Sequence, residues 1–281
     1  MSGVPHVGTL SEILRAITLQ KAGIPVQMVL GDLDAYNGKN IPLKRTLGLA
    51  KKYEKFILSL GFNQRGGSIL RTQYNALSVL RTSYIIGHFM DDEMFNNAEE
   101  DLHYFYHKRG KADKGMTYKR KLSLNLMIAD FVNLYMENKI NNVLVILGID
   151  EHKYVRFACE TIQRIKKDEN FNDFNINLAG MYSPMNKGFK GYPKMSKSFP
   201  DSGIRVDMNP EEIRNKIIYE EGKYDKPENN VVYQMMASVS YYTAEEIKKL
   251  YKLCLKGGSD WEKAKKEYAE ILIKICSKWK E

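Results

Sequence analysis

The chain has 281 residues and a formal net charge of +9, from 43 Lys+Arg against 34 Asp+Glu; this length indicates one large domain with appendages or two domains. The positive charge favours a polyanionic partner such as RNA or a nucleotide, with a general enrichment in lysine as the alternative. The three widely spaced cysteines (Cys159, Cys254 and Cys276) argue against a disulfide framework or a zinc site, and the lack of a signal segment or a long apolar run predicts a soluble cytoplasmic protein without membrane contact.

The first 70 residues predict alternating helices and strands, which is the order of an α/β sheet. The expected elements are a helix over about 10–22, a strand over 24–30, an amphipathic helix over 40–60 and a short strand over 68–70. Asp34 follows the first strand. Loops beyond the carboxyl ends of parallel strands form the ligand crevice, so Asp34 is a candidate substrate contact, with the capping of a turn as the alternative.

Residues 2–9, Ser-Gly-Val-Pro-His-Val-Gly-Thr, form a glycine-containing turn that leads into the first helix. A turn at a helix N-terminus is suited to approaching phosphate with backbone N–H groups. His6 and Gly8 lie at this turn, and the absence of a side chain at Gly8 would let a base or a ribose come close to the backbone.

The middle of the chain combines a less regular segment with a strongly helical one. Residues from 75 to about 120 are rich in aromatic and basic side chains and are interpreted as helices inserted between two halves of the sheet. A helix is expected over about 122–135, and it contains Asp130 within an apolar pattern. A carboxylate there is costly unless it is paired or faces a ligand, so a functional contact and a structural salt bridge are both open.

The clearest buried strand covers 142–147 and runs into Gly148-Ile149-Asp150-Glu151, before a helix over about 153–165. Asp150 is a candidate for bonding the hydroxyl pair of a ribose. A further strand over 176–185 leads through a glycine-containing loop to Lys194-Met195-Ser196-Lys197-Ser198. Two lysines among small hydroxyl residues suit a polyphosphate that is held while it reacts, although a solvated basic loop is the alternative.

Two separated motifs together resemble the signatures of class I aminoacyl-tRNA synthetases. The segment Ser2-Gly3-x-x-His6-Val7-Gly8-Thr9 resembles their HIGH box, and 194–198 matches their KMSKS loop. The resemblance covers nearly the whole chain and is nearest to the tryptophanyl/tyrosyl subgroup. It implies an α/β fold with a Rossmann-like, doubly wound parallel sheet and a C-terminal α-helical region. The implied domains are 1–208, with a helical insert at about 75–125 and the KMSKS loop at 188–200, and 209–281 on the tRNA side.

Three details are more similar to tryptophanyl than to tyrosyl enzymes. The KMSKS loop continues as Phe-Pro-Asp-Ser-Gly-Ile, and 148–156 is similar to the tryptophanyl G-I-D-Q-D-P-Y-x-R. Leu-Met-Ile-Ala-Asp at 126–130 resembles L-M-A-A-D, whose aspartate faces the indole nitrogen. Tyrosyl enzymes carry a tyrosine and a glutamine upstream of that aspartate, where Ser123 and Met127 stand here, which disfavours tyrosine.

The resemblance also implies roles for individual residues. The catalytic groups are His6, Lys194 and Lys197. The ATP-binding residues are Gly3, Gly8, Thr9, Gly148, Asp150, Met195, Ser196 and Ser198. The amino-acid contacts are Asp34, Met127, Asp130 and Glu151. The implied substrates are an amino acid, with tryptophan before tyrosine, ATP with Mg²⁺, and tRNA; a homodimer is implied, and a metal site made by the protein is not.

The chain departs from the family pattern in three places. Thr9 replaces the final histidine of the HIGH box, Glu151 stands where glutamine is usual, and the strand that usually precedes the first turn has no counterpart. A truncated paralogue is therefore one expectation. The sequence is also compatible with a paralogue that forms an adenylate for an acceptor other than tRNA, and with a non-catalytic module that binds RNA or a protein partner.

Overall fold

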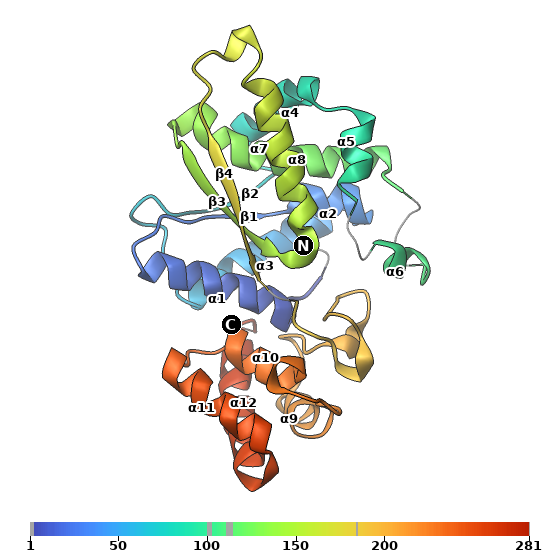
Figure 1. Ribbon diagram of the computed structural model, residues 1–281, viewed down its shortest axis with the longest axis vertical. Coiled ribbons are helices and arrows are strands. Elements are labelled where there is room, and N and C mark those ends of the chain that lie inside the picture. Colours follow the sequence, from blue (N-terminus) through green and yellow to red (C-terminus); the bar gives the residue numbers. More distant parts are fainter. Residues whose placement is uncertain (1–2, 100–102, 111–114, 184, 281) are drawn as a thin grey trace. The chain divides into compact units, whose positions relative to one another are not determined.

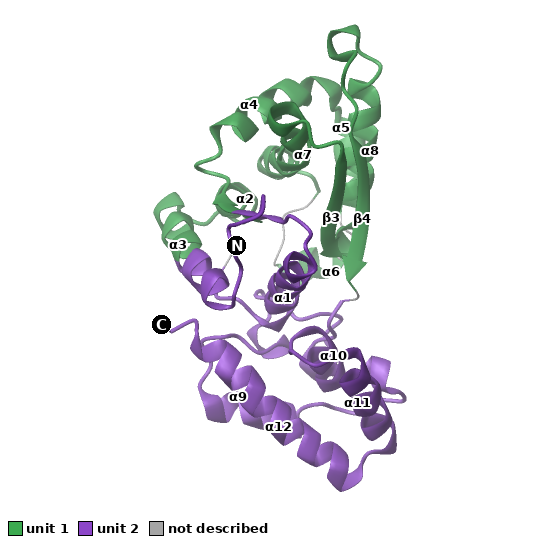
Figure 2. Cartoon of the chain, turned by 90° about the vertical axis from the view of Figure 1, so that its left-hand side faces the viewer, with its two compact units in different colours: residues 1–2, 29–51, 70–184 green, residues 3–28, 52–69, 185–281 purple. Residues whose placement is uncertain are grey.

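A computed structural model describes residues 3–99, 103–110, 115–183 and 185–280. Ser2 and two parts of the predicted insert, 100–102 and 111–114, lie outside the described residues. The chain divides into two compact units (Figure 2). Unit 1 holds the described residues of 29–51 and 70–184, and unit 2 holds those of 3–28, 52–69 and 185–281. The domain boundary between residues 208 and 209 stays a prediction.

The central motif of unit 1 is a parallel strand pair with a helical crossover (Figure 1). β3 (Asn142–Gly148) pairs in parallel with β4 (Asn177–Ser183), from Asn142 opposite Asn177 to Gly148 opposite Ser183. α8 (His152–Ile165) connects them and packs against β4. The predicted strands and helix are confirmed here, because each has an apolar pattern that matches its own period.

A second parallel pair is formed by β1 (Gln27–Leu30) and β2 (Ile69–Thr72). The backbone N–H of Ile69 donates to the carbonyl of Val26, and that of Gln73 donates to the carbonyl of Leu30. The residue numbers of both partners increase together, as they do in a parallel pair. The first strand begins at Gln27, three residues later than the apolar run at 24–30 predicts. Pro25 lacks the N–H that a ladder needs, which explains the late start.

The predicted helix over 40–60 is confirmed as a single helix, whereas the loop expected between the first strand and this helix is wrong. α2 (Asp32–Lys39) occupies the segment that was expected to be a polar loop, and α3 (Leu43–Ser59) begins only after Pro42. Asn40 adopts a left-handed backbone conformation with a φ of 52°, which ends α2. Asp32 and Asp34 lie in the first turn of α2, where carboxylates favour a helix start.

The remaining helices of unit 1 surround an apolar core. They are α4 (Leu77–Ile86), α5 (Asp92–Asn97), α6 (His103–His107) and α7 (Tyr118–Asn138). α7 packs against both α4 and α2. Its residues Ile128, Ala129 and Val132 are fully buried in the core cluster, so the helix is fixed along the face that also carries Asp130.

Unit 2 contains the first helix and the C-terminal helices. They are α1 (Val7–Lys21), α9 (Pro210–Tyr219), α10 (Val231–Ser238), α11 (Ala244–Lys256) and α12 (Gly258–Ser277). Side chains cap both α9 and α11 in capping boxes, Asn209 with Glu212 and Thr243 with Glu246. α12 packs against α9 and α11 through buried residues such as Trp261.

Short 3₁₀ helices lie between these elements in the described part of the chain. They are η1 (Gly87–Phe89), η2 (Ile149–Glu151), η3 (Glu169–Phe171), η4 (Phe189–Gly191), η5 (Pro200–Ser202) and η6 (Pro227–Asn229). Within the described ranges, none of the helices has the length and apolar character needed to span a membrane.

Candidate active site

His6 is the N-cap of α1 in unit 2. Its Nδ1 accepts a hydrogen bond from the backbone N–H of Thr9 at 3.3 Å. Because Nδ1 is the acceptor, the proton of the neutral ring lies on Nε2, which is then a donor. A Cβ at Gly8 would come within 2.9 Å of Cε1 of His6, so the ring needs a glycine at that position. Thr9 contributes through its backbone, which explains how the turn is built without the usual histidine there.

The electrostatic surroundings of His6 bring it together with both loop lysines. Burial lowers the pKa of His6 to about 3, and the positive charges of Lys197 and then Lys194 contribute to this lowering. The imidazole is therefore neutral at physiological pH. A neutral donor beside two cationic side chains is a combination that can receive an anionic ligand.

Backbone pairing fixes the turn of His6 against the segment that follows the lysine loop. The N–H of Val7 donates to Ile204 at 3.0 Å, and the N–H of Val206 donates to Pro5 at 3.0 Å. His6 and Arg205 form the antiparallel bridge between these bonds. Segments about 200 residues apart in sequence are thus held side by side within unit 2.

The loop of residues 194–198 is braced by Ser202, which is fully buried. The Ser202 hydroxyl accepts from the N–H of Ser196 at 2.8 Å and donates to the carbonyl of Ser196 at 3.3 Å. Met195 is also buried, and its N–H donates to Asn186. The N–H of Ser198 donates to the hydroxyl of Ser196 at 3.2 Å. The loop therefore has a defined conformation, which a freely solvated basic loop would lack.

Lys197 has an unusual partner in the same unit. Its Nζ donates to the hydroxyl of Tyr53 at 2.9 Å, and that hydroxyl donates to the carbonyl of Gly3 at 2.9 Å. Burial lowers the pKa of Lys197 to about 8. Of the predicted residues of unit 2, the structure thus joins Gly3 and Lys197 through the Tyr53 hydroxyl, a link that the sequence does not reveal.

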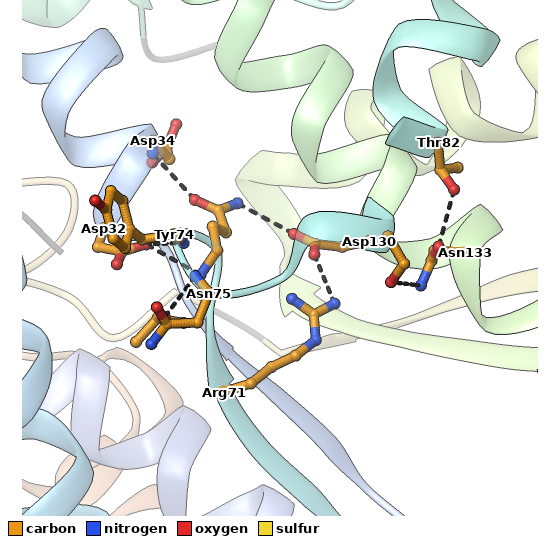
Figure 3. A network of polar contacts seen from close by, with 11 residues as sticks. Asp32, Asp34, Arg71, Tyr74, Asn75, Thr82, Asp130 and Asn133 are labelled. Carbon is orange, nitrogen blue, oxygen red and sulfur yellow. Dashed lines mark hydrogen bonds and ion pairs between the residues drawn. The ribbon is translucent and has the colours of Figure 1, made fainter. Parts of the chain in front are cut away.

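Unit 1 contains a second polar cluster, which is centred on Asp130 (Figure 3). Arg71 Nη2 contacts Asp130 Oδ1 at 2.7 Å, and Gln73 Nε2 donates to Asp130 Oδ2 at 3.1 Å. The side-chain oxygen of Gln73 accepts from the N–H of Asp34 at 3.0 Å, so Gln73 links the two predicted aspartates. Burial raises the pKa of Asp130, and Arg71 and Gln73 oppose that rise. The structural salt bridge that the sequence offered as one alternative for Asp130 is present. The contact of Asp130 with an amino acid stays a prediction.

The other predicted amino-acid contacts lie elsewhere in unit 1. Met127 precedes Asp130 by about one turn on α7 and packs, partly buried, against the core cluster. Glu151 lies at the end of η2, directly after β3. The structure therefore brings Asp34 and Asp130 together through Gln73, whereas Met127 contributes to packing.

Gly148 and Asp150 lie where β3 passes into η2. Asp150 is buried, and a Cβ added at Gly148 would come within 2.6 Å of its Oδ1. Because Gly148 has no side chain, the Asp150 carboxylate can lie against the backbone at the end of β3. Among the described residues of both units, His, Cys, Asp and Glu side chains do not gather in groups of three or more that could hold a metal ion.

Three residues of the two clusters are not predicted from the sequence: Tyr53, Arg71 and Gln73. Tyr53 lies in the apolar pattern of α3, which indicates only a core position. Arg71 and Gln73 lie at the end of β2, where two polar side chains so near a strand of an α/β sheet could have drawn attention. Ser202 lies in the continuation Phe-Pro-Asp-Ser-Gly-Ile of the loop, but its bracing hydrogen bonds are seen only in the folded chain.

Comparisons with known proteins agree with this architecture. The sequence profile of the family described as "tRNA synthetases class I (W and Y)" matches residues 2–277. Tryptophan–tRNA ligase of Thermoplasma acidophilum is 27% identical over 280 residues, with 77% of this chain and 64% of that protein covered. This chain thus spans less than two thirds of the length of that relative.

Two solved structures share the fold. Tryptophanyl-tRNA synthetase from Aeropyrum pernix matches with a TM-score of 0.79 at 21% identity, over 99% of this chain and 75% of that chain. Tyrosyl-tRNA synthetase from Archaeoglobus fulgidus, complexed with L-tyrosine, matches with a TM-score of 0.75 at 17% identity, over 99% of this chain and 86% of that chain. The expected Rossmann-like fold with a C-terminal helical region is confirmed by these similarities.

Proposed function

This chain belongs to the family of class I tRNA synthetases for tryptophan and tyrosine, and on that premise we propose that it activates an aromatic amino acid with ATP and transfers it to tRNA. The observation that carries the proposal is the backbone pairing of the His6 turn with the segment that follows the lysine loop, where the charges of Lys197 and Lys194 help to keep the imidazole neutral. The relative that is a tryptophan–tRNA ligase supports tryptophan as the first candidate, with tyrosine as the second. A role in protein synthesis goes with a cytoplasmic location.

The first step of the proposed reaction is an in-line displacement at the α-phosphate of ATP. The carboxylate of the amino acid attacks the phosphorus, the bond to the bridging oxygen breaks, and pyrophosphate leaves with the electron pair. Positioning and charge stabilisation can provide most of the catalysis, because this step needs no proton transfer. A hydroxyl of the terminal tRNA ribose then attacks the carbonyl of the aminoacyl-adenylate, loses its proton and displaces AMP.

His6 and the two lysines would act on the charge that develops during the first step. His6 would donate its Nε2–H to a phosphate oxygen, while Lys194 and Lys197 would stabilise the negative charge on the departing pyrophosphate. By analogy with an oxyanion donor, each contact made mainly in the transition state would contribute about 2–4 kcal/mol. Mg²⁺ would arrive bound to the triphosphate, because it keeps several waters and commonly binds together with substrate phosphates.

Each unit by itself contains further proposed ATP contacts. In unit 2 the proposed contacts are Gly3, Gly8, Thr9, Met195, Ser196 and Ser198. Gly8 and the backbone of Met195 would frame the adenine. In unit 1, Asp150 would accept from the ribose hydroxyls at the end of β3, where Gly148 leaves it room.

The proposed amino-acid contacts are Asp34, Met127, Asp130 and Glu151, all in unit 1. Both oxygens of the Asp130 carboxylate already accept from Arg71 and Gln73. A carboxylate oxygen has two lone-pair positions, and the N–H of a substrate side chain would be one of the donors to Asp130. Arg71 would then keep Asp130 charged, and hence an acceptor, in a buried place.

A homodimer and a tRNA surface complete the proposal. α4 presents large apolar side chains to solvent, namely Leu77, Tyr84 and Ile85, with Tyr84 90% exposed. A second copy of the chain would cover them, and sedimentation velocity of the Tyr84→Ser variant would show weaker association.

The net charge of +9 supports contact with the phosphates of tRNA.

ATP–pyrophosphate exchange with each of the twenty amino acids tests the proposal. We expect exchange with tryptophan first, tyrosine second, and a large loss in the Lys197→Ala variant with little change in amino-acid binding. Charging of total tRNA with the same amino acid follows. Exchange without charging would favour a paralogue with another acceptor. The absence of exchange and of ATP binding would favour a non-catalytic module and would contradict the proposal.

A further inference from the structure

One phenol in unit 2 joins the two signature segments. The Tyr53 hydroxyl donates to the carbonyl of Gly3 at 2.9 Å, and it accepts from Nζ of Lys197 at 2.9 Å. Gly3 belongs to the turn that carries His6, and Lys197 belongs to the loop of residues 194–198. Tyr53 itself lies on α3 and is 144 residues away from Lys197 in sequence.

The direction of both hydrogen bonds follows from the single proton of the phenol. Since the O–H proton goes to the carbonyl of Gly3, the oxygen can only accept from Lys197. Burial raises the pKa of Tyr53, so the phenol stays neutral at working pH. Nζ of Lys197 also lies 5.4 Å from the centroid of the Tyr53 ring, which favours the ammonium form.

A neutral partner has a specific consequence for Lys197. A carboxylate at this position would cancel the charge of the ammonium and compete with any incoming phosphate. A phenol orients the ammonium through one bond and leaves its positive charge intact. The remaining two protons of the ammonium stay available as donors to a ligand.

The ring of Tyr53 is itself held in place. Tyr53 is 2% exposed, and Trp279 packs edge-on against it with ring centroids 5.4 Å apart. Trp279 packs in the same way against Phe56, at 5.3 Å. The Lys278 ammonium donates to the carbonyl of Ser59 at 2.8 Å, which fixes the end of the chain to α3. The Tyr53 hydroxyl is therefore held in place, and it cannot move along with the loop of residues 194–198.

We propose that Tyr53 is a positioning residue for the nucleotide chemistry of unit 2: its hydroxyl ties Lys197 to the Gly3 turn and so directs the ammonium to the phosphates that His6 receives. The inference rests on the proposed function, because it assigns Tyr53 to the ATP step of that reaction. Tyr53 need not contact ATP, and it acts through Lys197.

The first test is a double-mutant cycle on ATP–pyrophosphate exchange. Tyr53→Phe keeps the ring and removes the hydroxyl, and Lys197→Met keeps most of the stem and removes the charge. We expect Tyr53→Phe to lower kcat roughly tenfold, the size of one hydrogen bond to a charged group, with the KM for the amino acid unchanged. In the Lys197→Met background the same substitution should have no further effect on kcat. Equal losses of kcat in both backgrounds would overturn the proposal.

The second test does not depend on activity. Chymotrypsin cleavage within residues 189–199 is followed under native conditions, without ATP, in the same four proteins. Tyr53→Phe and Lys197→Met should each speed cleavage roughly tenfold. The double variant should be cleaved no faster than either single variant, because both substitutions remove the same hydrogen bond. Tyr268→Phe is the matched control: it also removes a buried hydroxyl that donates to a carbonyl, that of Val239, and it should leave loop cleavage and kcat unchanged.

The two tests separate the two proposals. A wild-type chain without exchange would refute the proposed function and, with it, the positioning role of Tyr53 in the ATP step, while coupled cleavage would still establish the hydrogen-bonded link between Tyr53 and Lys197. An active chain with additive effects on cleavage would refute this link and leave the proposed function standing. Coupled cleavage with additive effects on kcat would show a contact that does not position Lys197, which also overturns the inference.

Discussion

The lowered pKa of Lys197 predicts an alkaline limit to activity. Burial brings this pKa from 10.5 to about 8, so half of the side chains are neutral near pH 8 and about nine tenths are neutral one pH unit higher. Only the ammonium can stabilise charge on a departing pyrophosphate. The kcat/KM for ATP should therefore fall about tenfold per pH unit above pH 8.

The assay is ATP–pyrophosphate exchange at subsaturating ATP between pH 6.5 and 9.5. The control is Lys197→Arg, whose guanidinium stays charged throughout this range and should remove the alkaline limb whatever its absolute rate. His6 should add no acidic limb above about pH 4, since its pKa is lowered to about 3. A wild-type profile that stays flat to pH 9.5, or an equal limb in the arginine variant, would refute the reasoning.

The contribution of Lys197 to folding stability changes in the opposite direction over the same range. Between pH 8 and 10.5 the unfolded chain binds the proton of Lys197 more tightly than the folded chain does. Folding stability from this group therefore rises with pH in that window, and it is lowest below pH 8. A thermal melt at each pH would separate the two effects.

Three further substitutions have defined outcomes. Arg71→Met leaves the buried carboxylate of Asp130 unpaired and should cost about 3 kcal/mol of unfolding free energy in urea, most of which adding Asp130→Asn should recover; an unchanged midpoint would contradict the pairing. Gly8→Ala brings a methyl group within 2.9 Å of His6 and should lower exchange at least about tenfold with little change in melting temperature, whereas full activity would show that the ring can move. Ser202→Ala removes both hydrogen bonds that brace the loop and should speed its cleavage by chymotrypsin; equal cleavage rates would show that the loop holds without it.

The elements that the sequence predicts well are those whose signal is local. The strand at 142–147 and the helix that follows it depend on residues a few positions apart. The short helix α2 is not predicted, whereas Asn40 and Pro42 both mark the break before α3.

The clusters are predicted less completely because their contacts are long-range. His6 and Lys197 are recognised by their motifs, which are local in sequence. Tyr53 reaches Lys197 across 144 positions, and Arg71 reaches Asp130 across 59, so periodicity carries no information about either pair. The apolar pattern around Asp130 correctly indicates a buried carboxylate, and its guanidinium partner can be found only in three dimensions.

The two polar clusters differ in the partner that they provide for a desolvated charge, and this difference helps to choose among the functions considered. In unit 1 the buried Asp130 is paired with a guanidinium, as expected for a charge that must persist without a ligand. In unit 2, Lys197 is buried enough to lower its pKa, and its hydrogen-bond partner is a neutral phenol. That desolvation destabilises the ammonium until an anion approaches. A structural scaffold gains nothing from such an arrangement, whereas a site that receives a polyphosphate uses the uncancelled charge.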